Sequence, residues 1–237
     1  MNVQEIQYHA DELQMRSTLY VPSDEDGPRP GVLVFPEAFG LGENARTRAE
    51  RLAGLGYVAL ACDYYGEAKQ YDAFEEALAG VKAMQDAPER ARARALGGLQ
   101  ALADCPGVDR SRIAAIGYCF GGTLALELVR SGADIAGAIG FHSGLGALAP
   151  AVEGAKAPVL VCIGADDPGI DAAQRLAFET EMRDAGIDWQ MKLYGGVVHS
   201  FTNPHADQLG MPEFARYSTK ADENSWEEML TFFRTIF

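Results

Sequence analysis

The chain has 237 residues and a formal net charge of −14, so its surface repels nucleic-acid phosphates and anionic lipid headgroups. Nucleic acid and membrane are therefore excluded as expected partners. Hydrophobic residues make up 48% and charged residues 23%, as in an ordinary soluble globular protein with one core. No apolar run approaches the roughly 18 residues of a membrane span, and the start, MNVQEIQYHADELQ, lacks the apolar stretch of a signal peptide. We expect one domain over residues 1–237, in the cytoplasm.

The predicted elements alternate between strands and helices. The first is a half-exposed strand near a sheet edge, since Leu13, Met15, Leu19 and Val21 recur at odd positions. Buried strands are expected in GVLVF, YVALAC, RIAAIGY, IAGAIGF, PVLVCIG and WQMKLYG. Helices are expected in ENARTRAERLAGLG, FEEALAGVKAMQ, ERARARALGGLQALA, GTLALELVRSG, DAAQRLAFETEMRDAG and SWEEMLTFFRTIF. This order predicts an α/β fold, with a mainly parallel central sheet and helices on both faces.

Two connections bear on function. Only residues 142–158 separate the strand ending near Phe141 from the strand starting near Val159, which leaves no room for an inserted lid domain. Residues 203–222 form a long segment of weak periodicity, and such segments inside compact domains are more often functional than idle. We expect this segment to form a wall of a binding pocket.

Four cysteines differ in their surroundings. Cys62 and Cys162 lie in apolar strand-like runs and are expected to pack as small hydrophobes, while Cys105 precedes Pro106 in an expected turn. There is no CxxC pair, and four histidines form no zinc-like cluster, so we expect neither a metal nor another cofactor. Cys119 is the cysteine whose neighbours require a chemical explanation.

Cys119 lies in Gly117-Tyr118-Cys119-Phe120-Gly121, between an apolar strand and an amphipathic helix. This is the G-x-nucleophile-x-G turn, with cysteine where serine usually stands. The glycines are needed because a Cβ at either position would clash where strand and helix close together. The helix N-terminus also favours thiolate over thiol. The other interpretation is a glycine-rich turn that contains an incidental cysteine.

Chain order supports the catalytic interpretation. In this fold the nucleophile is followed by an acid and then a histidine. Asp166 and Asp167 come just after the PVLVCIG strand, and His199 lies in a loop after the last strand. His142 also follows a strand and is expected to line the same rim. Active sites of open α/β sheets form outside the carboxyl ends of the strands, where these residues would converge.

These residues define a hydrolytic mechanism. His199 is expected to maintain the Cys119 thiolate, and the carboxylate to hold the imidazole and stabilise imidazolium. The thiolate would attack an acyl carbon, with the oxyanion held by backbone N–H groups of Phe120 and of the loop after GVLVF. Water would then hydrolyse the thioester. The expected partner is a small-molecule ester or lactone, and the oligomeric state stays open.

Four motifs together resemble the dienelactone hydrolase family of α/β-hydrolases. They are the GYCFGG elbow, the EAFG turn from Glu37 to Gly40, the G-x-x-D-P turn and the HSF segment, and the resemblance runs from about Val32 onward. It implies an ester or lactone hydrolase.

The resemblance also implies roles for single residues. It implies Cys119, Asp167 and His199 as the triad, with Asp167 chosen over Asp166 by the G-x-x-D spacing. It further implies that Glu37 contacts the resting cysteine and helps to deprotonate it, and that Ala38 gives the second oxyanion N–H. The residues alone allow Glu37 to be a turn carboxylate.

One departure from the family concerns the substrate. Dienelactone-cleaving members carry an arginine in the loop just after the histidine, whereas this chain reads His199-Ser200-Phe201-Thr202-Asn203. We expect Asn203, Phe214 and Tyr217 to line the pocket, with a hydrogen bond from His142 at the opposite rim. The apolar and aromatic content favours uncharged acyl groups over carboxylates.

Nearby arginines leave an alternative open. Arg90 and Arg94 would share one face of a helix, and Arg92 lies between them in sequence. They form either a solvated face or an anion site that replaces the missing cation.

Parts of the sequence are also compatible with two other functions. Gly40-Leu41-Gly42-Glu43-Asn44-Ala45 fits G-x-G-x-x-A, and Asp63 stands where a ribose-binding acid would lie, which suggests a dinucleotide-binding protein. The residues Pro36 to Phe39 loosen the turn that this motif requires. The other alternative is an inactive scaffold with a redox-sensitive thiol. Cysteine phosphatase chemistry is disfavoured because Ala125 occupies the position of its arginine.

Overall fold

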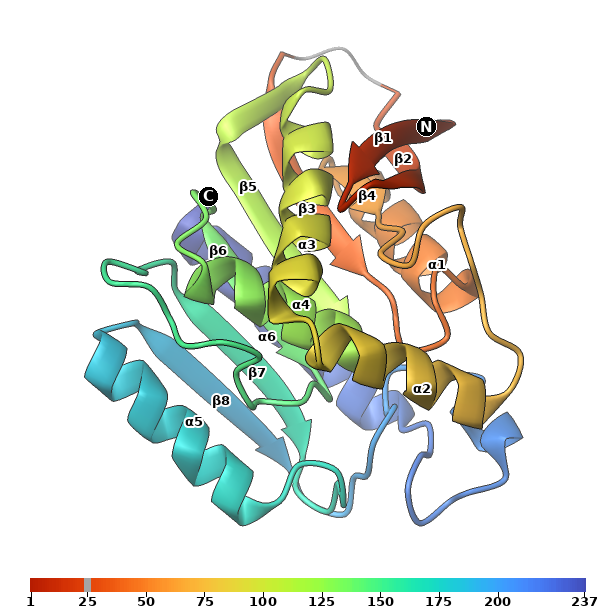
Figure 1. Cartoon of the computed structure of the whole chain (residues 1–237), viewed down its shortest axis with the longest axis vertical. Helices are drawn as coiled ribbons and strands as arrows, with labels where there is room; N and C mark the ends of the chain where they lie inside the picture. The colour runs from red at the N-terminus through yellow and green to blue at the C-terminus, as the bar shows by residue number, and fades with distance from the viewer. Residues whose placement is uncertain (24–26) are drawn as a thin grey trace.

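The computed structural model describes residues 1–23 and 27–237, which form an eight-stranded sheet flanked by helices (Figure 1). The strand order is β1-β2-β4-β3-β5-β6-β7-β8. The strands are β1 (Asn2–Ala10), β2 (Leu13–Val21), β3 (Arg29–Phe35), β4 (Val58–Ala61), β5 (Val108–Tyr118), β6 (Gly137–Phe141), β7 (Val159–Gly164) and β8 (Trp189–Tyr194). The helices are α1 (Glu43–Gly54), α2 (Phe74–Gln85), α3 (Pro88–Ala103), α4 (Phe120–Arg130), α5 (Ala172–Ala185) and α6 (Thr219–Ile236), with a 3-10 turn at Ala206–Leu209.

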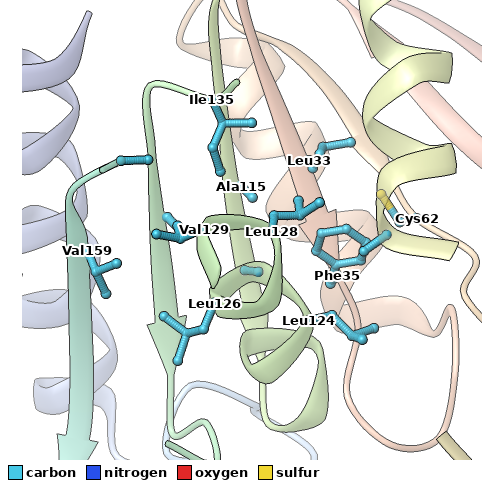
Figure 2. Packing of buried hydrophobic residues seen from close by; sticks show 14 of the residues in the cluster. Leu33, Phe35, Cys62, Ala115, Leu124, Leu126, Leu128, Val129, Ile135 and Val159 are labelled. Carbon is cyan, nitrogen blue, oxygen red and sulfur yellow. The ribbon is translucent and has the colours of Figure 1, made fainter. Parts of the chain in front are cut away.

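The sheet is buried on both faces by helices. Leu33 and Phe35 of β3 pack on the side of α3, α4 and α5, and Figure 2 shows this core around α4. Val32 and Val34 face the opposite core, which α1 and α6 cover. The strands from β3 to β7 therefore carry apolar residues at successive positions, since both pleat faces lie in a core, whereas the edge strand β8 alternates apolar residues with Gln190 and Lys192. The predicted α/β-hydrolase architecture is confirmed.

The N-terminal region differs from the sequence prediction. β2 lies near the edge, as expected, but it pairs antiparallel with both β1 and β4 and is mostly buried, so β1, which was not predicted, forms the edge itself. β1 gives little hydrophobic signal because nearly all of its side chains are exposed or half-buried. The hairpin turn is made by Asp11 and Glu12, both with positive φ. Within residues 1–23 and 27–237, no helix combines the length and apolar character needed to cross a membrane.

The C-terminal helix begins earlier than SWEEMLTFFRTIF suggested. Ser218 caps α6 by accepting a hydrogen bond from the Ala221 N–H (3.4 Å), which starts the helix at Thr219. The irregular segment after His199 is correspondingly shorter, and Asp222 belongs to the first turns of the helix.

The carboxyl ends of five parallel strands carry the polar residues singled out in the sequence. Glu37 follows β3, Cys119 follows β5, His142 follows β6, Asp167 follows β7 and His199 follows β8. Because β3 leads to α1 on one face and β5 leads to α4 on the other, a crevice opens between these strand ends. The topology thus collects residues from distant segments at one edge of the sheet.

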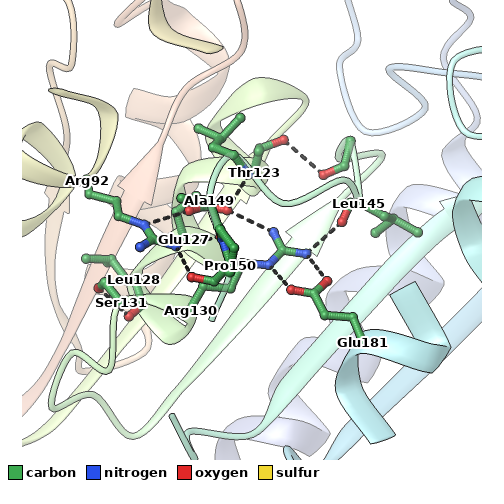
Figure 3. Close-up of polar contacts among 12 residues, drawn as sticks. Arg92, Thr123, Glu127, Leu128, Arg130, Ser131, Leu145, Ala149, Pro150 and Glu181 are labelled. Atoms are coloured by element: carbon green, nitrogen blue, oxygen red, sulfur yellow. Dashed lines mark hydrogen bonds and ion pairs between the residues drawn. The ribbon is translucent and has the colours of Figure 1, made fainter. Parts of the chain in front are cut away.

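A buried ionic cluster fastens the β6–β7 connection to α4 (Figure 3). Arg130 pairs with Glu127 (3.1 Å) and Glu181 (2.8 Å) and donates to the Leu145 carbonyl oxygen (2.7 Å). Arg92 also pairs with Glu127 (2.9 Å), so it belongs neither to a solvated face nor to an anion site. Arg130 and Glu127 have almost no exposed surface, so each depends on its partners for charge compensation.

We expect Arg130→Leu to lower the free energy of unfolding by about 3 kcal/mol or more, because two carboxylates lose a buried partner. Urea denaturation of purified protein measures this loss. The matched control is Arg183→Leu, which breaks the exposed Arg183–Glu179 pair (62% and 32% exposed) and should cost less than about 1 kcal/mol. Equal losses in both variants would contradict a special contribution of the buried cluster.

Candidate active site

The turn at Cys119 is a strained junction between β5 and α4. Cys119 has φ 54° and ψ −123°, a conformation that non-glycine residues rarely adopt. A Cβ on Gly117 would lie 2.1 Å from the Gly121 carbonyl oxygen, and a Cβ on Gly121 would lie 2.3 Å from that of Pro36. Both glycines are therefore required by close backbone approach. The turn leaves the Cys119 side chain in the cavity at the strand ends.

Asp167 and His199 form a buried pair. The Asp167 Oδ2 atom lies 2.7 Å from His199 Nδ1, and Oδ1 accepts a hydrogen bond from the Gly169 N–H (2.8 Å). Asp167 is 3% exposed and His199 8% exposed. The neighbouring Asp166 is exposed instead. Of the two adjacent carboxylates, the structure brings Asp167 to the histidine.

The ring of His199 is held by the segment from Met211 to Tyr217. The His199 N–H donates to the Phe214 carbonyl oxygen (3.0 Å), and the Arg216 N–H donates to the His199 carbonyl oxygen (3.1 Å). The Phe214 ring stacks on the imidazole, with centroids 5.2 Å apart and an interplanar angle of 22°. Phe214 thus lines the cavity, as expected, and also orients the histidine.

The electrostatics at His199 favour imidazolium. Burial alone lowers the pKa of His199, but the charge of Cys119 and the hydrogen bond to Asp167 outweigh it and raise the pKa to about 10. A hydrogen bond between His199 and Cys119 contributes to the rise. The arrangement therefore favours a protonated imidazole beside Cys119.

Two tyrosines orient the loop after β3. The Tyr64 hydroxyl donates to the Glu37 carbonyl oxygen (2.8 Å), and the Tyr65 hydroxyl donates to that of Ala38 (2.9 Å). Because the peptide is planar and trans, fixing the Glu37 carbonyl directs the Ala38 N–H the opposite way. Phe120 is the first residue of α4, so its N–H has no intrahelical partner. Neither tyrosine belongs to a motif that could be recognised in the sequence.

Glu37 is held by two side-chain amides. Asn44 Nδ2 lies 2.6 Å and Asn203 Nδ2 3.2 Å from the same Oε1 atom of Glu37. Burial raises the pKa of the Glu37 carboxyl, and these hydrogen bonds together with the charge of Arg48 oppose the rise. No hydrogen bond joins Glu37 to the Cys119 sulfur among the described residues, and the Glu37 carboxylate is bonded to the two asparagines instead. Asn203 both lines the cavity and positions Glu37.

Arg48 is linked to the Glu37 carboxylate through Asn44, and no sequence motif pointed to it. It pairs with Asp222 (2.8 Å), donates to the Thr202 carbonyl oxygen, and bonds to Asn44 Oδ1 (3.3 Å). The Tyr217 hydroxyl also donates to Asp222 (3.2 Å). Tyr217 is not among the described residues that line the cavity, so it supports Asp222 instead of meeting a ligand.

The cavity at the strand ends has a volume of about 580 Å³. Its described lining combines Cys119 and His199 with apolar and aromatic side chains and with carboxylates, namely Ala38, Phe39, Tyr71, Phe74, Leu78, Phe214, Glu37, Glu43 and Asp72. None of the described lining residues is a lysine or arginine. No group of three or more His, Cys, Asp or Glu side chains among the described residues is placed to hold a metal ion.

His142 does not occupy the position expected of it. Its residue exposure is 0%, and it lies behind Cys119 and His199, outside the described cavity lining. Its Nδ1 atom is 3.2 Å from the Cys119 backbone nitrogen. The prediction that His142 lines the rim and contacts a ligand is therefore wrong, because the left-handed backbone after β6 turns its ring inward.

The remaining candidate residues serve structural roles. Arg94 and Arg90 both pair with Asp11, at 2.9 and 3.4 Å, and neither lines the cavity at Cys119. The carboxylate of Asp63 accepts hydrogen bonds from four backbone N–H groups, those of Arg16, Tyr65, Gly66 and Ala68. A ribose would have to displace these bonds, so the geometry does not support dinucleotide binding.

Comparisons with known proteins identify the family. The chain matches the model of the dienelactone hydrolase family over residues 15–237. It is 38% identical to a dienelactone hydrolase-like promiscuous phosphotriesterase from metagenomic libraries, with a TM-score of 0.92 over 100% of this chain and 98% of the other. A solved protein named m3DLH is 40% identical, with a TM-score of 0.94 and the same coverage. A Yersinia pestis protein provisionally named a carboxymethylenebutenolidase is 25% identical over 231 residues, 90% of this chain and 80% of that protein. The chain therefore belongs to the dienelactone hydrolase family of ester and lactone hydrolases.

Proposed function

We propose that this protein hydrolyses small carboxylic esters or lactones with Cys119 as the nucleophile and a thioester intermediate. The observation that carries the proposal is the juxtaposition of Cys119, in a strained turn at the N-terminus of α4, with a histidine held by Asp167 at 2.7 Å. Nucleophile, base and orienting carboxylate in this relation are the requirements of covalent acyl transfer.

In acylation the Cys119 sulfur donates an electron pair to the acyl carbon, and the carbonyl π pair moves to oxygen. The N–H groups of Ala38 and Phe120 are the proposed donors to that oxyanion, each worth roughly 10²–10³ in rate. As the tetrahedral intermediate collapses, the C–O bond to the alkoxide breaks. His199 gives its proton to the leaving oxygen, which leaves a thioester and a neutral imidazole.

In deacylation the neutral His199 takes a proton from water as its oxygen attacks the thioester carbon. Collapse of the second tetrahedral intermediate breaks the C–S bond and releases the carboxylic acid. The thiolate is regenerated beside imidazolium, which Asp167 stabilises through its hydrogen bond. No redox partner or metal enters this balance.

The charge of the cavity lining favours uncharged substrates. The described lining includes Glu37, Glu43 and Asp72 but no lysine or arginine. The loop just after His199, which ends in Asn203, also lacks the arginine that dienelactone-cleaving members carry there. A substrate carboxylate would thus lose water without gaining a cation. Neutral esters and lactones meet no such penalty. A phosphotriester is also uncharged, and that is the substrate class named for the 38% identical relative.

Cys119→Ala should abolish hydrolysis of 4-nitrophenyl acetate while leaving the melting temperature nearly unchanged, since only one sulfur is lost from the cavity. Mass spectrometry of rapidly quenched wild-type protein should find an acetyl group on the peptide that contains Cys119. The alanine variant should carry none. More than a tenth of wild-type turnover in the alanine variant would refute the assignment of the nucleophile.

Asp167→Asn should lower kcat by about 10³- to 10⁴-fold, because the imidazole loses the carboxylate that orients it. The substitution should also lower the pKa of His199 from about 10, because the hydrogen bond and the negative charge of Asp167 both raise it and both are removed. His199 then loses its proton at lower pH, and the alkaline limb of kcat/KM moves down. Profiles from pH 5 to 10.5, corrected for hydroxide hydrolysis, measure both effects. Asp166→Asn is the control, and an equally severe loss there would reverse the choice of carboxylate.

Neutral substrates should be preferred over carboxylates of equal reactivity. The matched pair is the 4-nitrophenyl ester of monomethyl adipate and the same ester with a free carboxylate, which differ only in one methyl group and whose chain is too long for efficient self-cleavage through a cyclic anhydride. We expect kcat/KM to be at least about tenfold higher for the neutral member, with a smaller gap in Asp72→Asn and Glu43→Gln. Arg90→Ala should leave the ratio unchanged. A preference for the carboxylate that is lost in Arg90→Ala would contradict this account.

A further inference from the structure

His142 is fixed by its backbone as well as by its ring. It follows β6 directly, its φ is +40°, and its N–H donates to the Cys162 carbonyl oxygen of β7 (2.8 Å). A left-handed conformation costs a residue with a Cβ roughly 1 kcal/mol or more. Here it aims the imidazole behind the Cys119 turn, where solvent does not reach it.

The contacts of the His142 ring determine which of its two nitrogen atoms carries the proton. His142 Nδ1 lies 3.2 Å from the Cys119 backbone nitrogen, whose hydrogen also reaches the Phe141 carbonyl oxygen (3.0 Å). A backbone N–H can only donate, so Nδ1 must carry a lone pair. The ring proton is then on Nε2, which lies 2.8 Å from Thr202 Oγ1 and donates to it. Burial, reinforced by His199 and Arg48, lowers the pKa of His142 well below its usual value, which agrees with a neutral ring.

The same ring also touches the proposed base. The imidazoles of His142 and His199 meet at 69° with centroids 5.0 Å apart, and Phe201 packs against His142 at 5.3 Å. Two adjacent imidazolium ions would repel each other in this buried site. A neutral His142 therefore allows His199 alone to carry the positive charge opposite Cys119.

A chain of hydrogen bonds continues from His142 to the far side of the cavity. Thr202 accepts from His142 through its hydroxyl and from Arg48 through its carbonyl oxygen. Arg48 bonds to Asn44, and Asn44 donates to the Glu37 carboxylate. This chain, from Cys119 N to Glu37, joins the loops after β3, β5, β6 and β8 through side chains.

We propose that His142 is a positioning residue for acyl transfer, a neutral imidazole that holds the Cys119 turn through Nδ1 and the His199 ring through its edge. The proposal rests on the proposed function, because its purpose is to align nucleophile and base. It assigns His142 no contact with substrate. Loss of this alignment should affect the chemical step, since a displacement of about 1 Å can cost 10²-fold in rate.

Three substitutions separate the two contacts of the ring. His142→Leu removes both nitrogens. His142→Asn retains an acceptor near the position of Nδ1 and suits the left-handed backbone, whereas His142→Gln retains a polar group only near the position of Nε2. We expect Leu to lower kcat by ten- to one-hundredfold with KM nearly unchanged, and Asn to restore more of kcat than Gln.

The second readout does not depend on turnover. The rate of iodoacetamide alkylation at Cys119, followed by peptide mass spectrometry from pH 5 to 9, reports the thiolate that His199 maintains. In His142→Leu this rate at pH 6 should fall by tenfold or more, and in His142→Asn by less. Melting temperatures establish that the compared variants are folded. A purely structural residue would lower the melting temperature without changing kcat or the alkylation profile of folded protein.

The outcomes are distinct. Wild-type kcat and alkylation in folded His142→Leu would overturn the positioning role, as would equal kcat losses in the Leu and Asn variants. If wild type hydrolysed no ester but the Leu variant still lost alkylation at pH 6, the proposed function would fail and the positioning role would stand. Should the Leu variant not fold, Thr202→Val removes the Nε2 partner at constant shape. It should lower kcat and alkylation together, and no change in either would overturn the proposal.

Discussion

The close approach of three backbone segments at Gly117 and Gly121 is the constraint on which the rest of the site depends. The end of β5, the start of α4 and the loop after β3 meet so closely that a Cβ at either glycine would lie within 2.3 Å of a carbonyl oxygen. This contact forces the left-handed backbone at Cys119 and points the N-terminus of α4 into the crevice. It also places the Ala38 loop beside Cys119. The buried cluster around Arg130 then holds the other end of α4 against α5.

The parts of the fold that the sequence predicts are those with a strong burial pattern. GVLVF and PVLVCIG are continuous apolar runs because their strands have cores on both sides, and this signal needs no tertiary information. β1 gives no such signal, since NVQEIQYHA is almost entirely exposed or half-buried and is held by its ladder to β2. The start of α6 was missed because Ser218 precedes a polar first turn, TKADEN, in which hydrophobic periodicity is absent.

The residues of the candidate site also differ in how far a local sequence pattern identifies them. Cys119 and His199 could be proposed from the sequence. The G-x-Cys-x-G turn is a short local motif, and His199 lies in the loop after the last recognisable strand. The choice of Asp167 came from family resemblance, and the structure supplies the physical difference, since Asp166 is exposed. His142 was assigned to the wrong side of the site because its direction depends on a positive φ that no pattern around it encodes.

The side chains that hold the Glu37 loop could not be predicted, because their contacts join segments that lie far apart in the sequence. Tyr64 and Tyr65 reach carbonyl oxygens of the Glu37 loop from 27 residues away, through hydroxyl groups that belong to no motif. Arg48 lies on an ordinary amphipathic helix. Only the tertiary fold reveals that its guanidinium faces a carboxylate and a carbonyl oxygen inside the protein.

The pair between Arg48 and Asp222 spans 174 positions, and this separation has a consequence for synthesis. During translation, Glu37, Arg48, Cys119 and His199 leave the ribosome before Asp222 does. Until α6 docks, the Arg48 guanidinium lacks the carboxylate of Asp222, its buried ion-pair partner. The nascent protein can therefore assemble most of its sheet before the buried ion pair between Arg48 and Asp222 has formed. Docking of α6 completes the core on that face and the ion pair of Arg48 in the same step.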